Sequence, residues 1–166
     1  RVIKRKKIEP NQTQINSDLL NRLLHMKTPI TVKLCWVFIV MRKQPGRELF
    51  HIINDESKRE NPTPLTVKRR IELTLALLKA LKTQVVDIGL IHRDIKPDNI
   101  MVDMSTEHIR VNIIDYDFSC PKEARPTDAH CTLTYAAPEQ LYAEEQTNKC
   151  DVFSAINSLP SFVVCT

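Results

Sequence analysis

The feature that most constrains this chain is a short polar stretch, His92–Asn99, enclosed by apolar runs on both sides. Pro97 has no backbone N–H donor, and its ring disfavours the helical region for Lys96, so the stretch cannot continue the helical pattern before it. It therefore forms a loop between packed elements. Such a density of polar side chains at that position predicts a functional loop.

Three side chains of this loop have complementary chemistry. The carboxylate of Asp94, with a lysine nearby, keeps its charge and can accept a proton from a hydroxyl group. Lys96 can neutralise a phosphate oxygen, and the amide oxygen of Asn99 suits a hard cation such as Mg²⁺. Together these groups fit phosphoryl transfer, in which positioning and charge neutralisation do most of the catalysis.

The sequence from His92 to Asn99, His-Arg-Asp-Ile-Lys-Pro-Asp-Asn, resembles the protein-kinase catalytic loop His-Arg-Asp-Leu-x-x-x-Asn. Its Lys-Pro pair is similar to the serine/threonine-specific branch of that family. The resemblance implies phosphoryl transfer from ATP to serine or threonine hydroxyls of a protein substrate. It also implies Asp94, Lys96 and Asn99 as catalytic residues, with ATP and Mg²⁺ as cofactors. The motif indicates relationship; activity is a separate question.

A second acidic stretch, Ile113–Ser119, begins with a predicted buried strand. It resembles the Asp-Phe-Gly segment of kinases, which implies that Asp115 binds the metal together with Asn99. Tyr116 would take the packing role of the phenylalanine. Asp117 stands where the family has glycine, a residue that tolerates backbone angles unfavourable for a side chain. A solvated acidic turn is the alternative.

The basic N-terminal segment, Arg1–Lys7, has three interpretations. Two of them are a solvated strand edge and a nuclear-targeting patch. The third is that Val-Ile-Lys at positions 2–4 resembles the end of the kinase strand Val-Ala-Ile-Lys, so that Lys4 contacts the nucleotide phosphates. Asn16–Met26 is predicted as the following helix. Its acid is Asp18, a shorter partner for Lys4 than the glutamate that the family uses.

Thr31–Leu34 and Trp36–Met41 are predicted strands. Residues 42–50 then resemble the hinge between the two kinase lobes, although Pro45-Gly46 would equally form a plain strand-to-helix turn. By resemblance, the residues around the nucleotide are Lys4 at the phosphates, Met41 as gatekeeper, Arg42 and Gln44 at the adenine edge, Glu48 at the ribose and Met101 under the adenine. Core packing explains Met101 equally well.

Residues 66–86 are predicted as a long buried helix capped by Thr66. Residues 54–64 are polar and rich in proline, which predicts a loop before it. Two short strands, 100–102 and 110–114, are expected after the catalytic loop. The apolar stripe of the long helix is predicted to comprise Val67, Ile71, Leu75, Leu78, Leu81 and Val85, widened by Leu77 and Ala80.

Residues 121–135 correspond by resemblance to the activation segment, which Ala-Pro-Glu at 137–139 closes. Arg93 would be held by a negative charge on this segment, and Asp128 offers one where the family has a phosphothreonine. Thr132 would bond both Asp94 and Lys96. Further along, Asp151 resembles the helix residue that braces the catalytic-loop backbone.

Composition excludes several classes of protein. The net charge of +4 is too small to argue for a nucleic-acid partner. Five scattered cysteines argue against a zinc site or a disulfide framework and favour a reduced, cytoplasmic chain. No apolar run is long enough to span a membrane, and the basic N-terminus lacks the apolar core of a signal peptide.

The expected fold is α+β, a kinase-like two-lobe fold that is incomplete, because 166 residues are few for such a domain and a glycine-rich loop is missing. The expected division is 1–41 as a partial N-terminal β lobe, 42–48 as the hinge and 49–166 as a partial helical C-terminal lobe. A protein serine/threonine kinase is the first interpretation. A pseudokinase or scaffold that binds nucleotide or a partner without catalysis, and a gene fragment unable to fold, are the alternatives.

Overall fold

The structure is a computed structural model that describes residues 2–7, 36–41, 43–58 and 64–159. The chain divides into two units, residues 1–43 and 44–166, and each is described here by itself. In the first unit, strand β1 (Val2–Lys7) pairs antiparallel with β2 (Trp36–Met41), and Lys4 is opposite Ile39. The strand predicted over 36–41 is therefore confirmed.

Several predictions for the first unit lie outside the described residues. They are the helix Asn16–Met26 with Asp18, the strand Thr31–Leu34 and the adenine-edge residue Arg42.

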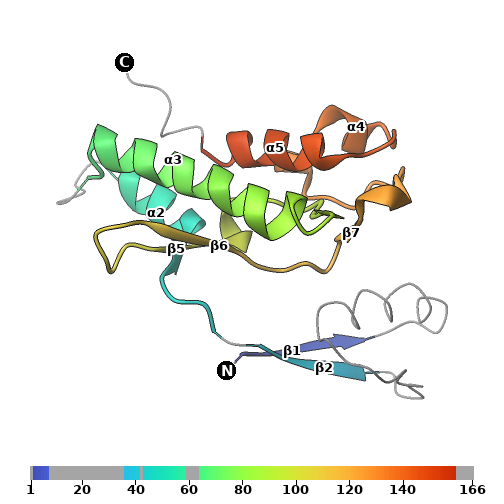
Figure 1. The fold of residues 1–166 in the computed structure, drawn as a ribbon, viewed down its shortest axis with the longest axis horizontal. Helices are drawn as coiled ribbons and strands as arrows, with labels where there is room; N and C mark the ends of the chain where they lie inside the picture. The colour runs from blue at the N-terminus through green and yellow to red at the C-terminus, as the bar shows by residue number, and fades with distance from the viewer. Residues whose placement is uncertain (1, 8–35, 42, 59–63, 160–166) are drawn as a thin grey trace. The chain divides into compact units, whose positions relative to one another are not determined.

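The second unit is built around helix α3 (Val67–Leu81), which continues into a π-helical turn at Lys82–Val86. Thr66 caps the N-terminus of α3, and its Oγ1 accepts a hydrogen bond from the Arg69 backbone N–H at 3.3 Å. Figure 1 shows α3 between α5 (Asn148–Asn157) and the hairpin of β5 (Ile100–Asp103) and β6 (Arg110–Ile113), and it contacts both β6 and α5. The long helix predicted for residues 66–86 is thus present.

The buried face of α3 agrees with the predicted stripe only in part. Leu77, Ala80, Leu81 and Val85 are buried as predicted, whereas Leu73 is buried without having been predicted. Leu73, Leu77, Ala80 and Leu81 are the buried residues, at the i, i+4, i+7 and i+8 spacing of one helical face. The helix is apolar on more than one side, and only tertiary packing selects the side that is covered. The predicted stripe residues Val67, Ile71, Leu75 and Leu78 are instead 57%, 56%, 62% and 41% exposed.

Two small antiparallel sheets position the loops. β3 (Arg47–Glu48), β5 (Ile100–Asp103) and β6 (Arg110–Ile113) form one of them. β4 (Leu90–Ile91) and β7 (Cys120–Pro121) form the other. Gly46 is required beside the first sheet, because a Cβ there would come within 2.1 Å of the Val102 carbonyl oxygen and its φ is +93°.

Helix α2 (Leu49–Glu56) was not predicted, and it replaces the first residues of the loop expected over 54–64. Leu49 and Ile52 are its buried residues, and they anchor it although its polar second half resembles a loop in composition. The last two helices among the described residues are α4 (Pro138–Leu141) and α5, which Thr147 caps by accepting from Lys149 N–H. Among the described residues, no helix is long and apolar enough to cross a membrane.

Candidate active site

The carboxylate of Asp94 is the centre of the candidate active site. Its Oδ1 accepts a hydrogen bond from the Thr132 hydroxyl at 2.6 Å. Its Oδ2 lies 3.0 Å from Asn99 Nδ2 and 2.9 Å from Lys96 Nζ. Lys96 Nζ also donates to Thr132 Oγ1 at 2.9 Å, which closes a ring of polar contacts. Asp94 is only 5% exposed, so these contacts hold the carboxylate in one orientation.

Backbone pairing brings Asn99 beside Asp115. The Ile114 N–H donates to the Asn99 carbonyl at 2.9 Å, so Asp115 follows directly after that contact. Asp115 has a φ of 68°, a left-handed conformation that Asp tolerates better than most residues. Both side-chain hydrogen bonds of Asn99 use Nδ2, which leaves its amide oxygen outside them. The two residues therefore offer an amide oxygen and a carboxylate, a donor set that suits Mg²⁺.

In the part of the chain that the structure describes, no three His, Cys, Asp or Glu side chains are grouped as a metal site.

Asp151 of α5 holds the catalytic loop from behind. Its two carboxylate oxygens accept the backbone N–H groups of His92 and Arg93, both at 2.8 Å. Arg93 has a φ of 72°, which is strained for a residue with a long side chain. The two hydrogen bonds oppose that strain. Burial raises the pKa of Asp151 to about 6, although both backbone donors favour its ionised form.

The Arg93 side chain joins the His92–Asn99 loop to residues 121–135, the segment that by resemblance is the activation segment. Its Nη2 contacts Asp128 Oδ1 at 2.7 Å and the Asp128 carbonyl at 2.8 Å. Its Nε donates to Gln146 Oε1 at 3.0 Å. The Arg93 side chain is 7% exposed, whereas the Asp128 side chain is 47% exposed and also contacts His130. The ion pair that the resemblance implies is therefore present.

His92 is held neutral in the core. Burial lowers its pKa to about 4, and its Nε2 lies 3.2 Å from the Ile114 carbonyl oxygen. Its ring packs against Tyr116 with centroids 4.8 Å apart. Tyr116 donates its hydroxyl to the Gln84 carbonyl at 3.1 Å, and burial raises its pKa to about 12. Tyr116 is thus a packing residue.

Asp117 does not have the backbone angle that glycine would supply. The left-handed conformation of this segment lies at Asp115, and Asp117 has no positive φ. The side chain of Asp117 is exposed. The replacement of glycine is therefore compatible with the backbone described here.

The residues expected around a nucleotide are divided between the two units. Glu48 and Met101 are cross-strand partners in β3 and β5, and Gln44 is half-buried in the same unit. Lys4 and Met41 lie in strands of the other unit, where only the backbone is described.

Sequence reasoning missed two buried glutamines. Gln140 accepts from the Ala137 N–H at 3.1 Å and donates to the Arg93 carbonyl at 3.0 Å. Gln146 holds the Arg93 side chain and donates to the Asp128 carbonyl at 2.8 Å. They are 1% and 0% exposed. The available sequence signal was position alone. Gln140 directly follows the Ala-Pro-Glu motif, and Gln146 lies shortly before Asp151. Such proximity in sequence is too weak a signal to predict these contacts.

Comparison with known proteins decides the family. The family model of the protein kinase domain matches residues 13–159. This chain belongs to the protein kinase family. Its mixture of helices and small antiparallel sheets is that of an incomplete two-lobe kinase fold, as predicted.

The relatives of this kinase chain include serine/threonine kinases. It is 31% identical over 127 residues to serine/threonine-protein kinase mos of Patiria pectinifera, which covers 70% of this chain and 33% of that protein. It is 34% identical over 87 residues to ribosomal protein S6 kinase alpha-4 of Mus musculus, with 50% and 11% covered. The chain therefore spans a third or less of the length of these relatives.

Proposed function

We propose that this chain carries the phosphoryl-transfer site of a protein kinase that uses ATP to phosphorylate serine or threonine hydroxyls. The observation that carries the proposal is the convergence of Lys96, Asn99 and Thr132 on the carboxylate of Asp94. Hydrogen-bond donors that fix the orientation of a carboxylate also fix the direction from which it can accept a proton. Such an orientation suits a general base. The serine/threonine-kinase relatives support the substrate class.

In the proposed reaction, Asp94 accepts the proton of the substrate hydroxyl while the hydroxyl oxygen bonds to the γ-phosphorus of ATP. The bond between that phosphorus and the β–γ bridging oxygen breaks, and ADP leaves. Lys96 compensates charge on the transferred group. Because the Lys96 ammonium already contacts Asp94 and Thr132, it is positioned before substrate arrives.

Asn99 and Asp115 would hold magnesium through the amide oxygen and the carboxylate. Mg²⁺ in such a site neutralises the charge of the phosphate oxygens. For nucleotide binding we retain Lys4, Met41, Arg42, Gln44, Glu48 and Met101 as proposed contacts. Of these, the cross-strand pair of Glu48 and Met101 supports a common binding surface at β3 and β5. We also retain residues 1–41, 42–48 and 49–166 as the proposed N-terminal lobe, hinge and C-terminal lobe.

We further propose that Asp128 replaces a regulatory phosphate. Its carboxylate contacts Arg93 without any modification, and Arg93 directly precedes Asp94. An activation segment held in this way would need no phosphorylation to orient the catalytic loop.

Incubation of the chain with labelled ATP, Mg²⁺ and a generic basic protein tests the catalytic proposal. We expect label transfer that Asp94→Asn removes and that Asp98→Asn, a matched change at an exposed position of the same loop, leaves unchanged. Equal transfer by the Asp94→Asn variant would refute the role of Asp94.

The second candidate is a pseudokinase, which Asp117 in place of glycine favours because it adds a carboxylate next to the proposed metal site. A rise in melting temperature with ATP and Mg²⁺, without label transfer, selects this alternative. Neither signal, together with a broad melting transition, selects the fragment that cannot fold.

A further inference from the structure

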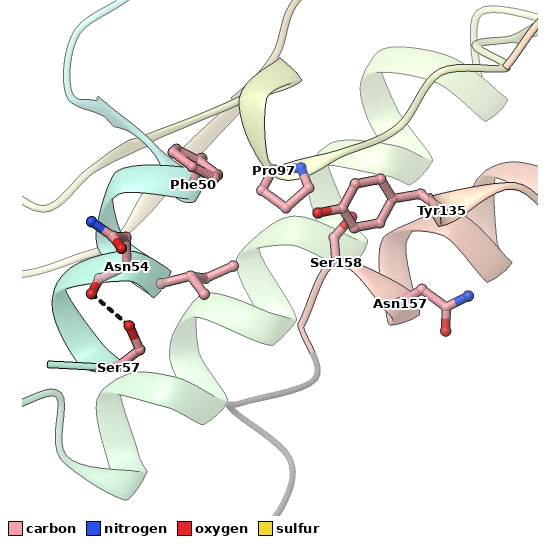
Figure 2. Close-up of a pocket in the computed structure, with 8 residues that line it drawn as sticks. Phe50, Asn54, Ser57, Pro97, Tyr135, Asn157 and Ser158 are labelled. Carbon is pink, nitrogen blue, oxygen red and sulfur yellow. Dashed lines mark hydrogen bonds between the residues drawn. The ribbon is translucent and has the colours of Figure 1, made fainter. Parts of the chain in front are cut away.

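Residues 121–135, which by resemblance form the activation segment, are anchored at both ends. At the start, β7 pairs with β4, and Pro121 is opposite Leu90. At the end, the Ser154 hydroxyl of α5 donates to the Tyr135 carbonyl at 2.8 Å. Figure 2 shows the Tyr135 side chain at a pocket that it lines together with residues of α2, the catalytic loop and the end of α5. The middle of the segment is held by different contacts.

Gln146 holds the middle of the activation segment through both its backbone and its side chain. Its backbone N–H donates to the Pro126 carbonyl at 3.0 Å, and its Nε2 donates to the Asp128 carbonyl at 2.8 Å. Its Oε1 accepts from Arg93 Nε at 3.0 Å. One side-chain amide therefore joins the activation segment to the residue that directly precedes Asp94.

The Gln146 amide and the Asp128 carboxylate hold Arg93 in different ways. Gln146 is neutral and 0% exposed, whereas the Asp128 side chain is charged and 47% exposed. The first contacts Arg93 at Nε and the second at Nη2. Salt screens the attraction between exposed charges and acts much less on buried groups. Only one of the two contacts with Arg93 should therefore weaken at high ionic strength.

We propose that Gln146 is a positioning residue of the kinase site, an uncharged hydrogen-bond clamp that holds the activation segment on Arg93 in addition to Asp128. The inference rests on the proposed kinase function and concerns its regulation. The clamp acts through Arg93, which fixes the backbone just before Asp94. It also acts through the Asp128 carbonyl, four residues before Thr132, whose hydroxyl donates to Asp94. Release of the clamp should therefore lower kcat.

Two contacts that hold one segment should be partly redundant. A hydrogen bond to a charged group favours the held segment over the released one by roughly a hundredfold. Gln146→Met and Asp128→Ala should each lower kcat by about tenfold, and the double variant by about a thousandfold. The double loss exceeds the product because kcat levels off once nearly all molecules are in the held state. The KM for ATP should change little.

Salt dependence separates a positioning role from a general loss of structure. In Gln146→Met only the exposed ion pair of Asp128 with Arg93 remains, so kcat relative to wild type should fall about threefold further between about 0.05 and 0.5 M KCl. In Asp128→Ala the buried amide remains, and the ratio to wild type should stay constant. Gln140→Met is the matched control, because Gln140 is 1% exposed and donates to the Arg93 backbone carbonyl instead. It should lower the melting temperature without making kcat depend on salt.

A second variant and a measurement without ATP complete the test. Gln146→Asn keeps an uncharged amide but is one methylene shorter, so it cannot reach both Arg93 Nε and the Asp128 carbonyl. It should show the same salt dependence as Gln146→Met, and it carries the test if that variant does not fold. Hydrogen exchange of residues 122–134, measured by mass spectrometry, should be faster in each single variant and fastest in the double variant. Exchange in α3 should stay slow in all of them.

Three results would overturn the proposal. They are a wild-type kcat in folded Gln146→Met and Gln146→Asn, a loss of kcat that is equal at every salt concentration, and a double variant no less active than Asp128→Ala alone. Faster exchange of the segment in the variants of a chain that transfers no label would refute the kinase function and leave the clamp intact. Label transfer by the wild type, with unchanged exchange in the variants, would refute the clamp alone.

Discussion

The catalytic loop has an inner side, which Asp151 contacts, and an outer side, which carries Asp94 and Lys96. The two sides differ in the groups that hold them and in their exposure to solvent. On the inner side, backbone N–H groups of His92 and Arg93 are bound by Asp151, which is 1% exposed. On the outer side, Asp94 and Thr132 bond through side chains, and the partner Lys96 is 24% exposed. The inner contacts stabilise the loop conformation, whereas the outer contacts orient the groups that take part in the proposed reaction. The two sides should therefore respond differently to mutation, the inner side in stability and the outer side in activity.

The inner side should show the largest effect. Asp151→Ala removes the acceptor of two buried N–H groups, each of which costs about 1–3 kcal/mol when unsatisfied, so the free energy of unfolding should fall by about 2–6 kcal/mol. Denaturant unfolding measures this change. Asp87→Ala, which removes an exposed ion pair with Lys82, is the control and should cost less than about 1 kcal/mol. Equal losses in the two variants would remove the distinction between the sides.

On the outer side, Asp94→Asn should reduce activity strongly and change stability little. Loss of the general base should lower the transfer rate by about 10²–10⁴-fold, while the similar size of asparagine preserves most packing. Steady-state kinetics and unfolding should be measured on the same preparation. A loss of stability as large as that of Asp151→Ala would show that Asp94 is structural.

His92 should make the inner side sensitive to acid. Its pKa in the folded state is lowered to about 4, so between about pH 6.5 and 4 the unfolded chain binds a proton that the folded chain does not. This lowers stability as the pH falls, by up to about 3 kcal/mol. Asp151, whose pKa is raised to about 6, acts in the opposite sense, since below that pH the folded state binds the extra proton.

The contribution of His92 is isolated by comparing wild type with His92→Phe, because both retain Asp151. The stability of the variant relative to wild type should rise as the pH falls from about 6.5 to 4. His108→Phe, a change at an exposed histidine, should give no such trend. A constant difference between wild type and His92→Phe would contradict the prediction.

The connection between the two sides runs through Arg93 and should give the smallest effect. Asp128→Ala removes one hydrogen-bonded charge but leaves Gln146 on the guanidinium, so we expect about a tenfold loss of transfer rate. The same loss should appear in protein made without any kinase able to phosphorylate it. Glu123→Ala, an exposed acid of the same segment, should have little effect. Unchanged activity of Asp128→Ala would show that the ion pair does not regulate the site.

Local sequence determined the chemistry of the site and many of its elements. Pro97 required a loop, Thr66 marked the start of α3, and the two strands after the loop, β5 and β6, were predicted from their apolar residues. The order of residues from His92 to Asn99 identified the family before any geometry was known, because those residue types at those intervals serve one reaction.

Tertiary structure decided which surfaces are covered and which distant residues meet. α3 is apolar on more than one side, so its pattern did not reveal that Leu73 would be buried while Ile71 and Leu75 are exposed. The contacts of Gln140 and Gln146 with Arg93 join residues 47 and 53 positions apart. Hydrogen bonds over such intervals depend on the packing of α4 and α5 against the loop, and no local pattern encodes them.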